Sequence, residues 1–141
     1  MQLVYESKLY PSKKQEETLL RLLEDARNLY NSLLERKIEF YRESGKNISR
    51  FELQKELKGK YLEIPGSLKQ MVVYRVNIAF QRFFQKISHF PRFKGEGRYR
   101  TLELRQYEAD YRFKDGKLST WKIIGDIRMR GFREAQSSSR K

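Results

Sequence analysis

The sequence predicts an α+β fold in which a bundle of three to four helices is inserted into a small antiparallel β-barrel-like sheet. Three observations predict it: three serine-led capping boxes, a change from helical to alternating periodicity near residue 90, and an Asp-Gly turn between two short alternating segments. The 141 residues, 38% of them hydrophobic, suffice for one modest core but not for two independent domains. We expect a first strand in residues 1–11, the helical bundle in 12–89, a basic hinge with the remaining strands in 90–134, and a disordered tail in 135–141.

The first elements are a short strand and a long helix. Residues 3–10 are β-prone and stop at Pro11, and Ser12 and Gln15 then form a capping box that opens a helix. The helix is expected to run to Ser44, because Gly45 is a natural stop. Its apolar positions recur at helical spacing and are Leu19, Leu23, Ala26, Tyr30, Leu33 and Ile38.

Two further capping boxes predict two further helices, from Ser49 and from Ser67. The last helix has a broad apolar arc, formed by Val72, Val73, Val76, Phe80, Phe83, Phe84 and Ile87. A separate stripe holds Arg75, Arg82 and Lys86. Its remaining side holds Gln70, Asn77, Gln81 and Gln85, and no acidic residue.

A solvated helix face usually mixes both charges, because opposite charges four residues apart stabilise it. This face lacks that mixture, so we expect its counter-charges to arrive as phosphates, while its amide side chains can reach base edges. The alternative is an ordinary solvated face whose long basic side chains cover the apolar arc.

The hinge from His89 to Arg100 combines basic, aromatic and glycine residues. Eight basic residues and one acidic residue give residues 68–100 a net charge of +7, more than half of the chain's +13. The hinge is therefore either a nucleic-acid contact or a structural connection whose Phe90 and Phe93 enter the core. Tyr99, between two arginines, suits stacking on a base as well as packing. We expect His89 to be a helix-end or surface residue rather than a catalytic base.

Alternating segments after the hinge predict the remaining strands. They are residues 101–105, 111–113, 121–124 and 127–132, with an Asp115-Gly116 turn and with Arg128 and Arg130 on an exposed face. Trp121 is expected to belong to the core of the sheet.

Composition narrows the class of protein. A net charge of +13 makes nucleic acid the leading partner. The sequence has neither a run of roughly 18 to 20 apolar residues nor a signal-peptide start, so we expect an intracellular protein of the cytoplasm and nucleoid. The lack of cysteine and the single histidine exclude disulfides and His/Cys metal sites, and no cofactor is expected. The candidate nucleic-acid-binding residues are Arg75, Gln81, Arg82, Lys86, Arg92, Lys94, Arg98, Tyr99, Arg100, Arg128 and Arg130.

Five motifs resemble the amino-terminal region of the transposon-encoded OrfB/TnpB family, over nearly the whole chain. Residues 9–15 read LYPSKKQ, 26–31 ARNLYN, 79–84 AFQRFF, 90–100 FPRFK followed by RYR, and 114–125 KDGK followed by Lys122, Ile123 and Gly125. The resemblance implies a wedge-like barrel with an inserted recognition bundle, which binds a guide RNA and a short motif beside the target DNA.

Full-length members of the family continue into a RuvC-like nuclease domain, whose clustered carboxylates this sequence lacks. We therefore expect a chain that is truncated before that domain and is not catalytic by itself. Two alternatives stay open: a subunit of a split nuclease completed by a separate RuvC-like chain, and a repressor or competitor that binds without cutting.

Overall fold

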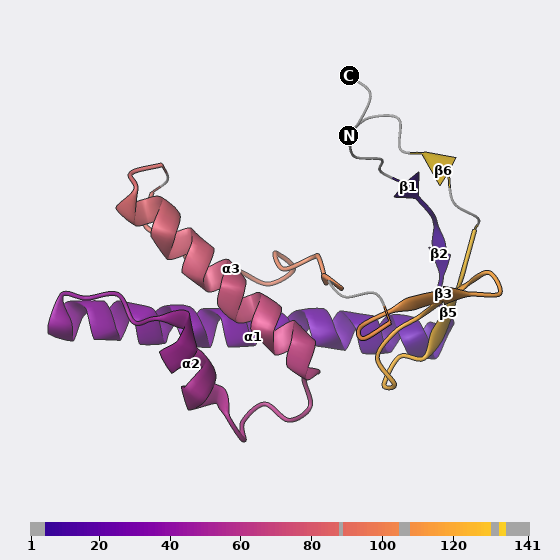
Figure 1. Cartoon of the computed structure of the whole chain (residues 1–141), viewed down its shortest axis with the longest axis horizontal. Coiled ribbons are helices and arrows are strands. Elements are labelled where there is room, and N and C mark those ends of the chain that lie inside the picture. Colours follow the sequence, from indigo (N-terminus) through magenta and orange to yellow (C-terminus); the bar gives the residue numbers. More distant parts are fainter. Residues whose placement is uncertain (1–4, 88, 105–107, 131–132, 135–141) are drawn as a thin grey trace. The chain divides into compact units, whose positions relative to one another are not determined.

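The computed structural model describes residues 5–87, 89–104, 108–130 and 133–134 (Figure 1). The chain divides into two compact units. The helical unit comprises Leu20–Leu104, and the strand unit comprises the first 19 residues together with residues 105–141. In chain order the elements are β1 (Tyr5–Glu6), β2 (Leu9–Tyr10), α1 (Lys13–Ser44), α2 (Arg50–Leu57), α3 (Gly66–Phe84), β3 (Arg112–Lys114), β4 (Lys117–Ser119), β5 (Asp126–Met129) and β6 (Arg133–Glu134).

The strand unit contains an open antiparallel sheet in the order β2-β5-β4-β3, and β1 pairs separately with β6. Leu9 of β2 pairs with Met129 of β5, so the start of the chain joins the last strands and the three helices lie between β2 and β3 in the sequence. The predicted α+β class and inserted helices are therefore confirmed. The described strands form an open sheet rather than the barrel-like one expected.

A tight hairpin joins β3 to β4 as predicted. Asp115 and Gly116 have φ values of 50° and 72°, so both central residues of the turn are left-handed. This is the conformation that Asp-Gly favours, because it matches the twist of the flanking strands.

Two predicted strands are wrong. Residues 101–104 form no strand, and residues 122–124 form a turn after the half-buried Trp121, whose carbonyl oxygen accepts from the amides of Ile124 and Gly125. The carbonyl oxygens of Ile124 and Asp126 accept hydrogen bonds from Gln15 Nε2, at 3.1 and 2.7 Å. The apolar run at 121–124 is thus held by the start of α1. Positions 3–4, 105, 131–132 and the tail 135–141 lie outside the described residues.

The first capping box is confirmed, the second forms only the N-cap bond of its serine, and the third is wrong. Ser12 and Gln15 bond reciprocally, at 2.9 and 3.1 Å, and the Ser49 hydroxyl accepts from the Glu52 amide. The third helix begins earlier, at Gly66, with Pro65 as its N-cap. Proline fixes an extended residue directly before the helix, so Ser67 already lies in the first turn.

The core of the helical unit lies between α1, α2 and α3. Leu22, Leu29 and Leu34 of α1, Leu53 of α2, and Val72, Val73, Val76 and Phe80 of α3 are fully buried. The predicted apolar arc of the last helix is therefore confirmed up to Phe80. Phe84 and Ile87 at its end are exposed.

Candidate nucleic-acid interface

Three of the predicted contact residues lie at the end of α3, and all three are exposed: Gln81 and Arg82 in its last turn, and Lys86 directly after it. Lys86 follows the helix with a φ of 61°. Its amide donates to the Phe83 carbonyl and that of Ile87 to the Arg82 carbonyl, at 3.0 and 2.9 Å, which is the Schellman end of a helix. A left-handed lysine at this position is unusual, because glycine adopts it without steric cost.

Lys86→Gly is therefore expected to stabilise the fold relative to Lys86→Ala. Alanine keeps the strain of a left-handed residue, whereas glycine removes it, and the difference in the free energy of unfolding should be about 1 kcal/mol. Urea denaturation of both variants measures it, and both have lost the same charge. Equal midpoints would contradict a left-handed residue at position 86.

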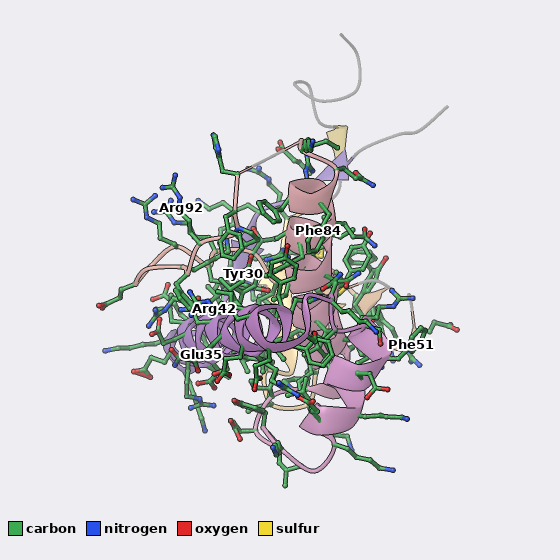
Figure 2. The ribbon with its side chains drawn as sticks, turned by 90° about the vertical axis from the view of Figure 1, so that its left-hand side faces the viewer. Tyr30, Glu35, Arg42, Phe51, Phe84 and Arg92 are labelled. Atoms are coloured by element: carbon green, nitrogen blue, oxygen red, sulfur yellow. The ribbon has the colours of Figure 1, made fainter. Side chains whose placement is uncertain are left out.

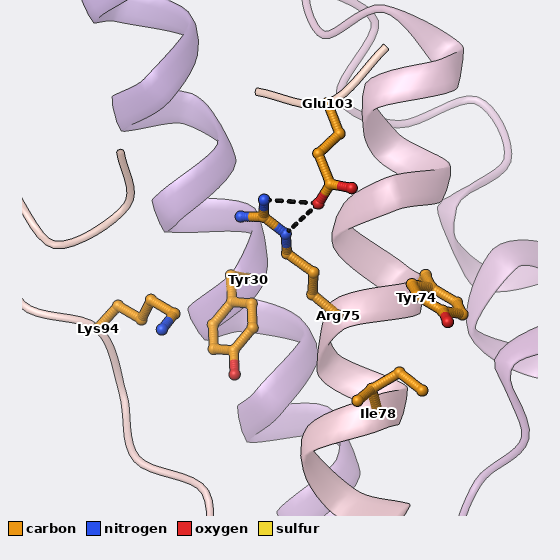
Figure 3. A pocket seen from close by; sticks show the side chains of 6 residues that line it. All are labelled: Tyr30, Tyr74, Arg75, Ile78, Lys94 and Glu103. Atoms are coloured by element: carbon orange, nitrogen blue, oxygen red, sulfur yellow. Dashed lines mark hydrogen bonds and ion pairs between the residues drawn. The ribbon is translucent and has the colours of Figure 1, made fainter. Parts of the chain in front are cut away.

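Arg75 is engaged inside the helical unit. Its Nε and Nη2 donate to one Glu103 carboxylate oxygen, at 3.1 and 2.7 Å (Figure 3). Its guanidinium also lies 4.9 Å from the ring centre of Tyr99. Arg75, Glu103, Tyr30, Tyr74, Ile78 and Lys94 line a pocket of about 340 Å³. The Glu103 carboxylate lines this pocket and already neutralises Arg75. The pocket is therefore less suited to a phosphate than the sequence-based prediction for Arg75 implies.

The hinge is fastened to α1 through the backbone of Lys94. The Lys94 carbonyl accepts from Arg27 Nη1 and Asn31 Nδ2, each at 3.0 Å, and the Lys94 amide donates to Asn31 Oδ1 at 2.8 Å. Asn31 thus pairs with both backbone groups of one residue, as a neighbouring strand would. The Lys94 ammonium lies 5.1 Å from the ring centre of Tyr30. Two of the motifs noted in the sequence, residues 26–31 and 90–94, therefore meet in one contact.

Loss of the Asn31 amide should loosen the hinge. Asn31→Ala leaves a half-buried amide and carbonyl with fewer partners, and we expect the free energy of unfolding to fall by about 2 kcal/mol. Chemical denaturation measures the change, with Asn28→Ala as the control because Asn28 is exposed on the same helix. If the two alanine variants were equally stable, the hydrogen bonds between Asn31 and the Lys94 backbone would make no net contribution to the free energy of unfolding.

Of the aromatic residues of the hinge, Phe90 and Tyr99 pack against other rings, Phe93 is 55% exposed and does not enter the core, and the arginines face solvent. Phe90 makes edge contacts with the rings of Phe80 and Phe83, and Tyr99 is only 5% exposed. Of the two roles predicted for Tyr99, stacking on a base and packing in the protein, the structure shows packing within the helical unit. Figure 2 shows Arg92 projecting away from the ribbon. The exposed basic residues of this segment are Arg92, Arg98 and Arg100.

Arg128 and Arg130 belong to the strand unit, and both are exposed. The Arg128 guanidinium lies 5.9 Å from the ring centre of Tyr10 on the paired strand. The Arg130 amide donates to the Lys8 carbonyl at 2.9 Å, and the Arg130 carbonyl accepts from the Ser7 hydroxyl. The backbone of this segment is thus fixed while both side chains remain accessible.

A second pocket, of about 500 Å³, lies where the start of α2 faces α3. We call it the α2–α3 pocket; its lining residues are Asn47, Ser49, Arg50, Phe51, Tyr74, Asn77, Ile78 and Gln81, with no carboxylate among them. Phe51, labelled in Figure 2, lies on α2. Phe51 is 65% and Tyr74 37% exposed, and the Arg50 guanidinium lies 5.3 Å from the Phe51 ring centre. Aromatic faces, amides and an arginine are the groups that hold unpaired nucleotides.

Sequence reasoning found the α3 side of this pocket, since Asn77 and Gln81 lie on its acid-free face. It missed Arg50 and Phe51. Phe51 reads as an apolar residue of a short helix, and the signal against that reading is its place in the first turn, next to an arginine.

Part of the chain is similar to a known family of domains. Residues 1–46 match the family model of the helix-turn-helix domain of OrfB proteins of the IS605 type. No curated protein shows significant similarity to the chain. The described residues contain no group of three or more histidine or acidic side chains placed to hold a metal ion. Nor does that part of the chain include a helix with the length and apolarity needed to cross a membrane.

The described part of the matched region has an unexpected geometry. It contains two short strands and one continuous helix, α1, rather than two helices joined by a turn. The family's name therefore does not describe the local structure within residues 5–46. Helix-turn-helix domains as a class bind DNA. Residues 1–46 are thus similar to the helix-turn-helix domain of IS605-type OrfB proteins.

Proposed function

We propose that this chain is a nucleic-acid-binding module of a TnpB-like transposon protein, non-catalytic by itself, which binds guide RNA, transposon-end DNA or target DNA. The observation that carries the proposal is the acid-free α2–α3 pocket together with exposed cations on the same unit. The proposed surface comprises this pocket and the side chains of Arg82, Lys86, Arg92, Arg98 and Arg100.

The distribution of ion pairs supports the proposal. In the described part of the chain, Arg27, Arg36 and Arg75 each pair with a glutamate of the protein. The cations of the proposed surface form no ion pair with a described carboxylate, and Arg100 donates only to the Gly97 carbonyl, at 2.9 Å. Exposed cations without counter-charges in the fold are suited to phosphates, whose binding releases counter-ions.

Sequencing the nucleic acid that co-purifies with the full chain tests this function. We expect a structured RNA or transposon-end DNA to be enriched over total cellular nucleic acid. Protein that carries no nucleic acid and binds neither RNA nor DNA at low salt would contradict the proposal.

A further inference from the structure

A buried lysine lies beneath the α2–α3 pocket. Lys37 on α1 is only 1% exposed. Its ammonium donates to Asn47 Oδ1, the Ile48 carbonyl and Asn77 Oδ1, at 2.7, 2.9 and 3.3 Å, and lies 5.2 Å from the Phe80 ring centre. All three acceptors are neutral, so one buried charge is held by oxygen dipoles from the 45–49 loop and from α3.

This ammonium determines how two amides of the pocket are oriented. A lysine ammonium only donates hydrogen bonds, so an amide that faces it must present its oxygen. Asn47 and Asn77 therefore turn Oδ1 toward Lys37, which leaves their NH₂ groups for other partners. The usual ambiguity between amide oxygen and nitrogen is removed here by chemistry. Neither NH₂ group donates a hydrogen bond within the described residues, and both asparagines line the α2–α3 pocket.

Ser49 supplies a further hydrogen-bond donor to the α2–α3 pocket. Its oxygen accepts from the Glu52 amide at 3.2 Å, which leaves the hydroxyl proton able to point to a ligand. Three groups of the pocket can thus donate, and Arg50 adds a fourth.

We propose that Lys37, acting as a positioning residue, makes the α2–α3 pocket select an unpaired base that presents hydrogen-bond acceptors. Thymine or uracil, with O4, and guanine, with O6 and N7, meet this requirement, whereas cytosine presents an amino group at the corresponding position. Phe51 and Tyr74 supply exposed rings for stacking, and Arg50 supplies a charge for the phosphate. This inference rests on the proposed nucleic-acid function.

Two single strands of equal size test the selectivity. Binding of fluorescent dT15 and dC15 to the full chain compares pyrimidines that differ only at the base edge and the C5 methyl group. We expect dT15 to bind about five- to tenfold more tightly, the range for one or two discriminating hydrogen bonds. Single-stranded dU15, which lacks the methyl group, should retain the preference over dC15.

The substitution Asn77→Asp replaces one hydrogen-bond donor of the pocket by an acceptor. A carboxylate keeps an oxygen toward Lys37 but replaces the outward donor by an acceptor, so the preference for dT15 should disappear or reverse. Asn28→Asp is the matched control: it makes the same charge change at an exposed position outside the pocket, and should weaken both strands equally. Lys37→Met should bring the ratio of the dT15 and dC15 affinities toward one, because the side-chain amides of Asn47 and Asn77 can then flip.

The outcomes separate the inference from the function. If neither strand binds at low salt and no nucleic acid co-purifies with the chain, the proposed function itself fails. If nucleic acid co-purifies but neither strand binds, the function stands and the base-selective pocket is overturned. If both bind and the wild-type ratio is one, or if Asn77→Asp leaves the ratio unchanged, the function stands and the role of Lys37 is overturned. Asn47→Asp carries the same test should Asn77→Asp not fold, since Asn47 lies in an exposed loop.

Discussion

The free energy of unfolding is expected to rise by about 3 kcal/mol as pH increases from 8 to 10.5, because of Lys37 alone. Burial lowers the pKa of Lys37 from 10.5 to about 8 in the folded protein. Between these two values the folded chain has released this proton while the unfolded chain retains it. The unfolded state therefore binds more protons, and raising the pH favours the folded state.

Urea denaturation of the wild type and of Lys37→Met at pH 7.5, 8.5 and 9.5 measures this effect. The wild type should gain roughly 2 kcal/mol over this range relative to the variant. The series stops below pH 10, since burial raises the pKa of Tyr30 and of Tyr99. Unfolding releases those hydroxyl protons more easily, which opposes the lysine effect at higher pH. Parallel pH profiles for the two proteins would contradict the lowered pKa of Lys37 in the folded state.

The combined variant Arg82→Ala, Arg92→Ala and Arg98→Ala should lose most of its affinity for nucleic acid. Each phosphate contact contributes about 0.7 to 0.9 to the slope of log affinity against log salt, so three lost contacts lower the slope by about 2 to 3. At roughly 100 mM salt we expect affinity to fall by about tenfold or more. Fluorescence anisotropy across a salt series measures both quantities.

A matched triple variant separates position from net charge. Arg21, Arg42 and Lys58 are also exposed but lie outside the proposed surface. Replacing these three by alanine lowers the net charge equally and should change the slope by less than one unit. An equal loss in both triple variants would mean that overall charge, and not this surface, attracts the nucleic acid.

Local chemistry made the first two helix starts and the hairpin predictable. The Ser12–Gln15 box and the Asp115-Gly116 turn depend on neighbours within four residues, and both form as expected. The strand expected at 101–105 depended on alternation alone. In the structure Glu103 bonds Arg75, a residue 28 positions away, and the segment joins the helical unit instead.

The candidate site was predictable only in part, because it depends on side chains brought together from distant positions. Arg82, Arg92 and Arg98 are exposed as their charge suggests, whereas Arg75 and Tyr99 turned inward to partners that no local pattern reveals. Lys37 carries a signal of burial in the sequence. It follows Tyr30, Leu33 and Leu34 at helical spacing, which places a lysine on the buried face of α1.

Ultraviolet cross-linking to 4-thiouridine-substituted RNA, or to its thiothymidine DNA counterpart, followed by mass spectrometry of the linked peptides, tests the proposed surface most directly. The full chain is used at low salt, so that weak contacts are retained. We expect cross-links in residues 47–51, 74–82 and 92–100, the segments that carry the α2–α3 pocket and the exposed arginines. Cross-links confined to the strand unit, or spread evenly over the basic residues of the chain, would contradict it.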